Sequence, residues 1–506
     1  MAVHASHESR PVSDGGEALT PGGLPIRHLS VNFRGDPSRV VLVPFGASQR
    51  HLTEVFDLVA GMGEAEVEGA LDRVMAAFSS RHARIEELFD GYYGDAAQSA
   101  GRDDAATSAR RRLIGAYFTA EYSLESAALF NPSLVIHPDQ THMPPEGVRV
   151  VLSLRAVGEG HRSSVVFRTG CLGPGTVATF DPPGEFTARA PVVTDKRYNR
   201  GLFRRKLGEM VVPAGPVDAV LGGLPEWFTL TELESALAAY LPRPDRTEAD
   251  RMVRRSMLWL AYANYEVRLE ADRPVSDLVL FPRSASEARG IEDLRLVRFR
   301  EDDGATTYYG TYTGFDGTNI LPLMLDTPDF HTVNIHTLNG ACIQNKGLAL
   351  FPRRIGGRYA MCGRIDGRNL YLMYSDNVYF WHSAEILARP RYPWEFRLIG
   401  NCGSPLETPE GWLLITHGVG PMRRYCIGAM LLDLEDPSRI RGRLPESLLA
   451  PAGEDREGYV PNVVYSCGSL IHAGNLWLPY AVSDTWTRIA VMPLDELLDR
   501  LIRSGP

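Results

Sequence analysis

The sequence of 506 residues is poor in cysteine: it has six, and none belongs to a Cys-x-x-Cys pair. Scattered cysteines without close histidine partners argue against a zinc site and a disulfide framework, so we interpret them as buried thiols. The Gly-x-Ser-x-Gly, P-loop, Gly-x-Gly-x-x-Gly and His-Glu-x-x-His motifs are also missing. The serine-hydrolase, nucleotide and zinc-protease chemistries therefore lack their signatures, and no metal site is predicted.

An excess of positive charge and long apolar runs are missing as well. The chain has 53 Lys and Arg against 62 Asp and Glu, a net charge of −9. It has no general attraction to phosphate backbones or anionic lipid, so we expect neither nucleic acid nor a membrane as partner. No apolar run approaches the roughly 18 residues that span a bilayer, and residues 1–23 lack the apolar core of a secretion signal. The expected location is the cytoplasm.

Hydrophobic periodicity divides the chain into segments. Residues 1–25 are rich in Ser, Gly and Pro and are expected to be a loose terminus, whereas 26–127 has apolar residues at helical spacing, such as Val55, Leu58 and Val59. A weaker helical pattern returns near 229–265. We therefore expect a helical extension over 26–127 and an insertion with helices over 176–270. The segments 128–175 and 271–506 would hold the first and the remaining blades of a β-propeller.

The rest of the chain has the short apolar runs and Gly, Asn, Asp or Pro breaks of strands and turns. One hairpin pattern occurs five times, at 148–170, 306–327, 357–376, 411–433 and 474–494, and its last four copies begin roughly 50 to 65 residues apart. This favours a mainly-β fold, a five-bladed β-propeller with an N-terminal helical segment and a helical insertion between the first and second blades. A β-sandwich is the alternative, but it leaves unexplained the polar residues at comparable points of the hairpins: Arg155, Thr313, Arg364, His417 and Ser483.

Three polar elements are candidates for chemistry. In the densest, Glu292 and Asp293 precede Arg295, which shares a strand face with Asp293 and could be the charge partner of a general acid. The alternative is a solvated turn. Lys346 is either an anion contact or a surface charge, and His417 is either a ligand contact or a buried core histidine.

Together these elements resemble glycoside hydrolase family 130, the mannoside phosphorylases and β-mannosidases that are built on a five-bladed propeller. The resemblance covers residues 128–175 and 275–500. The matching stretches are GIEDLRLVRF, NKGLALFPRRIGGRYAMCGR, LYLMYSDNVYFW, IGNCGSPLETPEGWLLITHGVG, IGAMLLDLEDPSRI, EGYVPNVVYSCG and LPYAVSD, with weaker matches in FNPS and LSLRAVGEGHRSS.

The resemblance implies an inverting enzyme that cleaves β-mannosidic bonds, with inorganic phosphate as co-substrate, mannose 1-phosphate as product and no cofactor. Asp293 would be the catalytic acid, and Lys346 and Arg364 would lie near the phosphate. The residues expected to hold the hydroxyls of a β-mannoside oligosaccharide or mannosyl conjugate are Asn131, Arg155, Glu292, Arg295, His417 and Asp484.

Two other functions stay open. A β-mannosidase would use water and would need a carboxylate base roughly 6.5–9.5 Å from the acid, for which Asp484, Asp316 and Glu457 are candidates. A non-catalytic carbohydrate-binding propeller is the third function, because one fold hosts many activities. The extension and the insertion have no counterpart in the resemblance. They could narrow the pocket or form the interface of a homo-oligomer.

The sequence departs from the family pattern at three positions. Leu294 stands where a proline is common, Gly347 where an acidic residue is common, and Gly363 where a histidine is expected. Phosphorolysis remains slightly favoured over hydrolysis, and this preference rests on six cations that could bind phosphate: Lys346, Arg364, Arg353, Arg354, Arg423 and Arg424.

Overall fold

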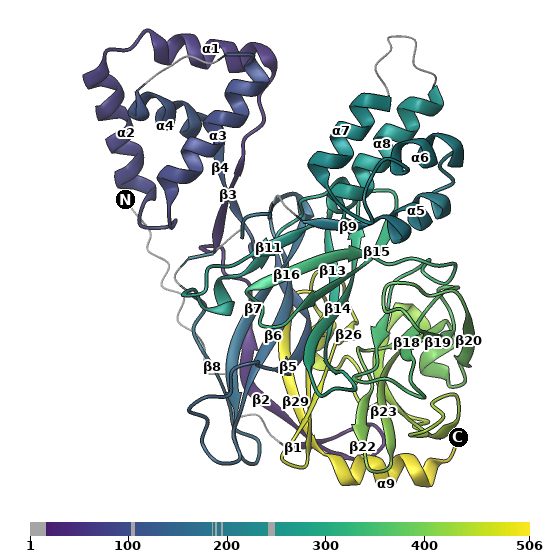
Figure 1. Ribbon diagram of the computed structural model, residues 1–506. Coiled ribbons are helices and arrows are strands. Elements are labelled where there is room, and N and C mark those ends of the chain that lie inside the picture. Colours follow the sequence, from purple (N-terminus) through teal and green to yellow (C-terminus); the bar gives the residue numbers. More distant parts are fainter. Residues whose placement is uncertain (1–16, 103–106, 185, 188–189, 194–195, 241–247) are drawn as a thin grey trace, which may run out of the picture.

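A computed structural model describes residues 17–102, 107–184, 186–187, 190–193, 196–240 and 248–506 (Figure 1). More of the described residues lie in strands, nearly all of them paired antiparallel, than in helices, so the expectation of a mainly-β fold is confirmed. None of the helices in these residues has the length and apolar content that a membrane crossing needs. All six cysteines lie in the described part; none is bonded to another, and all but Cys171 are buried.

The largest sheet consists of two antiparallel groups of strands joined by one parallel pair, Gly290 with Ser163. The first group has three long strands, β5 (Ala128–Ile136), β6 (Val148–Val157) and β7 (Ser163–Leu172), with the short strands β8 (Ala178–Phe180) and β12 (Val279–Leu280) paired to β7. The second group contains β13 (Gly290–Arg300), β14 (Thr306–Phe315), β15 (Ile320–Thr327), β16 (Thr332–Thr337) and β11 (Glu266–Arg268).

Three further sheets follow along the chain. One contains β17 (Ala349–Leu350), β18 (Tyr359–Gly363), β19 (Leu370–Ser375) and β20 (Ala384–Ala388). The next contains β21 (Leu398–Asn401), β22 (Leu406–Thr408), β23 (Gly411–Val419), β24 (Tyr425–Leu432) and β25 (Ile440–Arg443). The last contains β26 (Val464–Tyr465), β27 (Leu470–His472), β28 (Asn475–Val482), β29 (Trp486–Pro493), β2 (Pro25–Phe33) and β1 (Glu17–Leu19).

The five hairpins predicted from the sequence all form. They are β6–β7, β14–β15, β18–β19, β23–β24 and β28–β29. Their strands are almost fully buried: every residue of β23 is buried, and large side chains such as Trp412 and Trp477 are completely enclosed. Because both faces are buried, the sequences of these strands are continuous apolar runs and do not alternate strictly between apolar and polar residues.

Strands also occur in the segment 26–127, where we expected helices. Residues 25–33 form β2, which buries Ile26, Leu29 and Phe33 and lies between β1 and β29 in the last sheet. Residues 40–44 and 119–123 form a two-stranded ribbon of β3 (Val40–Pro44) and β4 (Thr119–Ser123). This β2–β29 pairing joins segments more than 450 residues apart, so it leaves no local signal in the sequence.

Except for the C-terminal one, the described α-helices form two units, which lie on the same side of the sheets in Figure 1. The extension carries α1 (Gln49–Ala60), α2 (Glu64–Phe78), α3 (Ile85–Ala100) and α4 (Ser108–Tyr117) on the β3–β4 ribbon, around a core of its own. The insertion has a separate core and contains β9 (Arg197–Asn199), α5 (Arg200–Glu209), α6 (Ala214–Leu221), β10 (Trp227–Thr229), α7 (Leu230–Tyr240) and α8 (Glu248–Tyr262). At the C-terminal end, α9 (Leu494–Ser504) packs on the last two sheets.

Candidate active site

A β-bulge in β13 aims the two adjacent carboxylates. The pairing of β13 with β14 shifts between Glu292 and Arg295, and Asp293 has a φ of 56°. In a regular strand neighbouring side chains point to opposite faces, but the bulge lets both carboxylates reach the same arginine, Arg155. The left-handed conformation is unfavourable for a residue other than glycine, so contacts with the surrounding structure must stabilise it.

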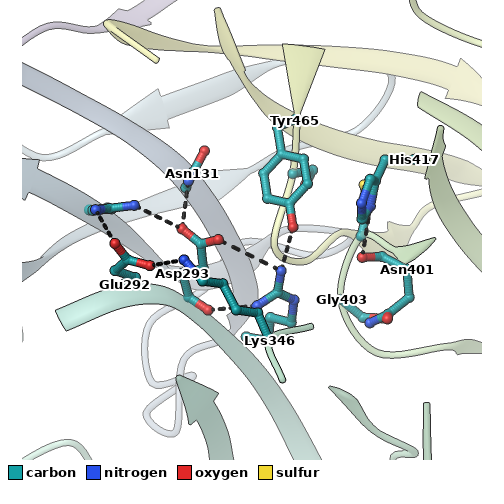
Figure 2. A network of polar contacts seen from close by, with 12 residues as sticks. Asn131, Glu292, Asp293, Lys346, Asn401, Gly403, His417 and Tyr465 are labelled. Carbon is teal, nitrogen blue, oxygen red and sulfur yellow. Dashed lines mark hydrogen bonds and ion pairs between the residues drawn. The ribbon is translucent and has the colours of Figure 1, made fainter. Parts of the chain in front are cut away.

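Two more left-handed residues lie in this cluster. In β5 the pairing shifts between Phe130 and Ser133, and Asn131 at that bulge has a φ of 50°. Its Nδ2 donates a 2.6 Å hydrogen bond to Asp293 Oδ1 (Figure 2). Asp484, in the turn between β28 and β29, also has a φ of 50°. Asn131, Asp293 and Asp484 are far apart in the sequence, and each is held in a strained backbone conformation.

Three cations surround the carboxylates. Arg155 donates to Glu292 Oε1 at 3.0 Å and lies 3.4 Å from Asp293 Oδ1, while Lys346 Nζ donates to Glu292 Oε2 at 2.5 Å. Arg295, only 2% exposed, donates to the Asp293 carbonyl at 3.0 Å and to the hydroxyl of Tyr465. Both carboxylates are largely buried, with side chains 13% and 14% exposed, so these charges interact through little solvent.

The cations decide the charge of Asp293. Burial by itself would raise the pKa of this carboxyl, but Arg155, Arg295 and Lys346, together with the Asn131 hydrogen bond, hold the pKa below its ordinary value. The protein without substrate therefore carries an ionised Asp293 at neutral pH.

Asp484 has the opposite character. Burial and the negative charge of Asp293 raise the pKa of Asp484 to about 6, against the opposing effect of Arg155 and Arg423. The pKa values of the two aspartates are thus shifted in opposite directions, as in carboxylates with different tasks in one site.

His417 on β23 is buried and uncharged. Its Nδ1 lies 3.2 Å from the carbonyl oxygen of Asn401, and its Nε2 lies 3.4 Å from Arg364 Nη1. Burial, and after it the charges of Arg364 and Arg295, lower the pKa of His417 well below its ordinary value. A neutral ring that donates from Nδ1 to the carbonyl leaves Nε2 as an acceptor for the guanidinium.

Comparison with known proteins identifies the family. A family model described as beta-1,4-mannooligosaccharide phosphorylase matches residues 270–503. A 1,2-beta-oligomannan phosphorylase of Thermoanaerobacter sp. (strain X514) is 32% identical over 233 residues, which are 45% of this chain and 75% of the relative. The chain belongs to glycoside hydrolase family 130.

Other relatives carry similar names. A beta-1,2-mannobiose phosphorylase from the same strain is 33% identical over 231 residues, covering 45% of this chain and 73% of the relative. Among solved structures, the complex of the Listeria innocua beta-1,2-mannobiose phosphorylase with beta-1,2-mannobiose is 20% identical, covers 75% of this chain and 93% of that chain, and has a TM-score of 0.43.

Most site residues expected from the resemblance to family 130 lie in one connected cluster. Direct contacts join Asn131, Arg155, Glu292, Asp293, Arg295 and Lys346. Arg364 and His417 contact each other, and the tyrosine that accepts from Arg295 packs edge-on against the His417 ring at 4.9 Å. Asp484 belongs to the cluster through electrostatic interactions, since the charges of Asp293 and Arg155 shift its pKa. The role of each residue in catalysis remains a prediction.

Other candidates lie elsewhere. Arg353 pairs with Glu407, and Arg354 pairs with Glu301. Asp316 is held in the β14–β15 turn by the backbone amides of residues 318 and 319, and Glu457 is exposed. Of the three proposed base residues, Asp484 is the one whose pKa is raised by the negative charge of Asp293.

Two residues of this candidate site were not predicted from the sequence. Tyr465 accepts the Arg295 hydrogen bond, and Asn401 supplies the carbonyl that orients His417. Both belong to stretches that match the family, EGYVPNVVYSCG and IGNCGSPLETPEGW. A tyrosine beside an apolar run is usually a core residue, so only the contact with a buried arginine distinguishes it.

Proposed function

We propose that the chain is an inverting mannoside phosphorylase. The observation that carries this proposal is a buried Asp293 held among Asn131, Arg155 and Arg295, in a chain 32% identical to a 1,2-beta-oligomannan phosphorylase. A phosphate oxygen forms a bond to the anomeric carbon while the bond from that carbon to the glycosidic oxygen breaks. Asp293 gives its proton to the departing oxygen. The products are α-mannose 1-phosphate and a sugar shortened by one mannose.

Protonation of Asp293 depends on the substrates. Three cations keep its carboxyl ionised in the free protein. A phosphate bound beside Lys346 would offset part of this positive charge and raise the pKa of Asp293, and the sugar would exclude the remaining water. Asp293 would then be protonated only when both substrates are bound.

The expected phosphate site has two cations. Lys346 is 35% exposed and already touches Glu292, and Arg364 faces the uncharged His417. Two cations suit a phosphate ion, which brings its own negative charge and needs no carboxylate base.

We propose that the strands form a five-bladed propeller whose last blade is completed by β2. Each group of strands contacts the next in chain order, and the last contacts the first, which supports a ring. The linking contacts are Gly290 with Ser163, Arg300 with Arg353, Ile399 with Arg368, Tyr425 with Val463, and Ser133 with Gly468. The hub of such a ring would hold the Asp293 cluster.

A β-mannosidase is the second candidate, and Asp484 favours it. A general base works best with a pKa near the working pH, and the pKa of Asp484 is raised to about 6 beside the proposed acid. In that reaction Asp484 would take a proton from the attacking water, and mannose would replace mannose 1-phosphate.

A product assay separates these functions. The protein is incubated with β-1,2- and β-1,4-mannobiose, with and without inorganic phosphate. We expect mannose 1-phosphate and mannose with phosphate and little product without it. Free mannose formed at the same rate without phosphate contradicts phosphorolysis, and sugar binding without any product indicates a binding module.

Replacing Lys346 tests the phosphate site. Lys346→Met removes one of two expected cations, so KM for phosphate should rise by about tenfold or more, the effect of losing one charged hydrogen bond. Arg353→Met is the matched control, because this cation pairs with Glu407 away from the cluster. Equal KM values for both variants would remove Lys346 from the phosphate site.

A further inference from the structure

Two aromatic side chains meet outside the buried cluster. The rings of Tyr459 and His161 stack with centroids 5.6 Å apart and planes 27° from parallel, and the Tyr459 hydroxyl lies 3.1 Å from His161 Nδ1. Tyr459 nevertheless remains 55% exposed. A large ring that is fixed by a stacking partner and a hydrogen bond, yet open to solvent, is unlike an ordinary core residue.

Hydrogen bonds tie Tyr459 to the turn that carries Asp484. The Tyr459 amide donates to Thr485 Oγ1 at 2.8 Å, and the amide of Val460 donates to the Ser483 carbonyl at 2.9 Å. The approach is close: a Cβ on Gly458 would lie 2.5 Å from Thr485 Oγ1. The exposed ring is therefore anchored one residue away from an aspartate that senses the charge of Asp293.

The N-terminal extension supports the other half of the pair. His161 ends the short 3-10 helix Glu159–His161 at the tip of the β6–β7 hairpin. The hydroxyl of Tyr122, on β4, lies 3.1 Å from the carbonyl oxygen of Glu159 and 2.9 Å from that of Arg162, and its one proton can be donated to either. A Cβ on Gly158 would lie 2.0 Å from the Ser123 carbonyl, so the hairpin tip lies directly on the ribbon. The family model, over residues 270–503, includes Tyr459 and the turn at Asp484 but not His161 or its support Tyr122.

We propose that the Tyr459–His161 pair is a platform for the sugar on the leaving-group side of the scissile bond, a role that rests on the proposed phosphorylase function. The reacting mannose needs the buried carboxylates, whereas the leaving sugar extends toward solvent. There the exposed Tyr459 ring offers an apolar face for the C–H groups of a pyranose, and Arg423, exposed at the β23–β24 tip and close enough to act on Asp484, offers hydrogen-bond donors.

The reverse reaction separates this platform from the catalytic cluster. The protein joins α-mannose 1-phosphate to mannose or mannobiose, and KM is measured for each substrate. Tyr459→Ala should raise KM for the acceptor sugar about 3- to 10-fold and leave KM for mannose 1-phosphate within twofold of wild type. Tyr459→Phe keeps the ring and should restore most of the acceptor affinity. Tyr117→Ala removes an equally exposed aromatic, 54% against 55%, from the extension and is the control.

Each outcome is decisive. An unchanged acceptor KM in Tyr459→Ala, or equal increases for both substrates, overturns the platform while the phosphorylase function stands. A wild-type protein that forms no product contradicts the proposed function instead. Calorimetric titration of mannose and β-1,2-mannobiose then still tests the platform: it is supported if Tyr459→Ala weakens only the disaccharide and overturned if neither or both are weakened.

Discussion

At the scale of single residues, left-handed backbone marks the candidate site. Asn131, Asp293 and Asp484 all have φ near 50°, which few non-glycine residues adopt, although Asn and Asp tolerate it best. Their side chains contact one another or sense one another's charge. Strain of this kind is found where a side chain must be aimed, so it agrees with the catalytic role proposed for Asp293.

Asp293→Asn tests that role. The amide keeps the size and the backbone tolerance of aspartate but has no proton to donate, so we expect turnover to fall by about 10²–10⁴-fold while mannobiose binding remains. Turnover is measured by product formation and binding by calorimetry. Asp316→Asn, in an exposed hairpin turn, is the control. Retention of most activity would exclude Asp293 as the acid.

Asp484→Asn should stabilise the protein in a pH-dependent way. The pKa of Asp484 is about 6 in the folded protein against an ordinary 3.8. Its ionisation therefore opposes folding above about pH 6, and it has no effect at low pH, where the group is protonated in both the folded and the unfolded state. The variant should therefore gain at most about 3 kcal/mol of unfolding free energy at pH 8 and nothing below about pH 3.5. Urea unfolding at both pH values measures this; an equal gain at both would contradict it.

At the scale of the element, the start of β13 depends on a glycine. Gly290 has a φ of 141°, and a Cβ there would lie 2.3 Å from Ser163 Oγ and 2.8 Å from its amide nitrogen. This contact is also the parallel pair that joins the first two groups of strands. The bulge at Glu292 and Asp293 follows directly, so the position of the carboxylates depends on this close approach.

Gly290→Ala should lower the free energy of unfolding by about 2–4 kcal/mol and reduce turnover, because the new methyl group pushes β13 away from β7. Gly304→Ala is the control. It also has a positive φ, 88°, but nothing lies within 4 Å of its Cβ, so it should cost only the backbone strain. Denaturant unfolding compares the two; equal losses would mean that the contact with Ser163 contributes nothing.

At the scale of the whole molecule, the helical extension is a separate unit. Its four helices have their own core, and the chain enters and leaves it at one point, where the Phe45 amide donates to the Phe118 carbonyl at 2.8 Å. The surface ion pair of Arg84 with Glu270 also links it to the rest, and pairs of this kind contribute little.

Replacing residues 46–117 with a short Gly-Ser turn should therefore leave the remaining protein folded, with the midpoint of its main unfolding transition changed by a few degrees. The β3–β4 ribbon stays, so Tyr122 still supports the β6–β7 tip. Differential scanning calorimetry and circular dichroism test this. Loss of the β-sheet signal would show that the extension stabilises the sheets, and a homo-oligomer that dissociates would reveal its interface.

By itself the sequence determined the local features: the five hairpins, the apolar strands and the run Glu292-Asp293-Leu294-Arg295. These follow from periodicity and turn residues over a few neighbours, and the family resemblance extended them to Asn131 and Asp484. A cytoplasmic location and a homo-oligomer stay predictions.

The tertiary structure decided the rest. The pairing of β2 with β29, the contact of Tyr465 with Arg295 and the ionised state of Asp293 each depend on groups far apart in the chain. The left-handed backbone of Asn131 and Asp293 depends on strand register, which a local pattern does not record. Charge, burial and strain at a site are sums over all neighbours in space, and folding alone brings those neighbours together.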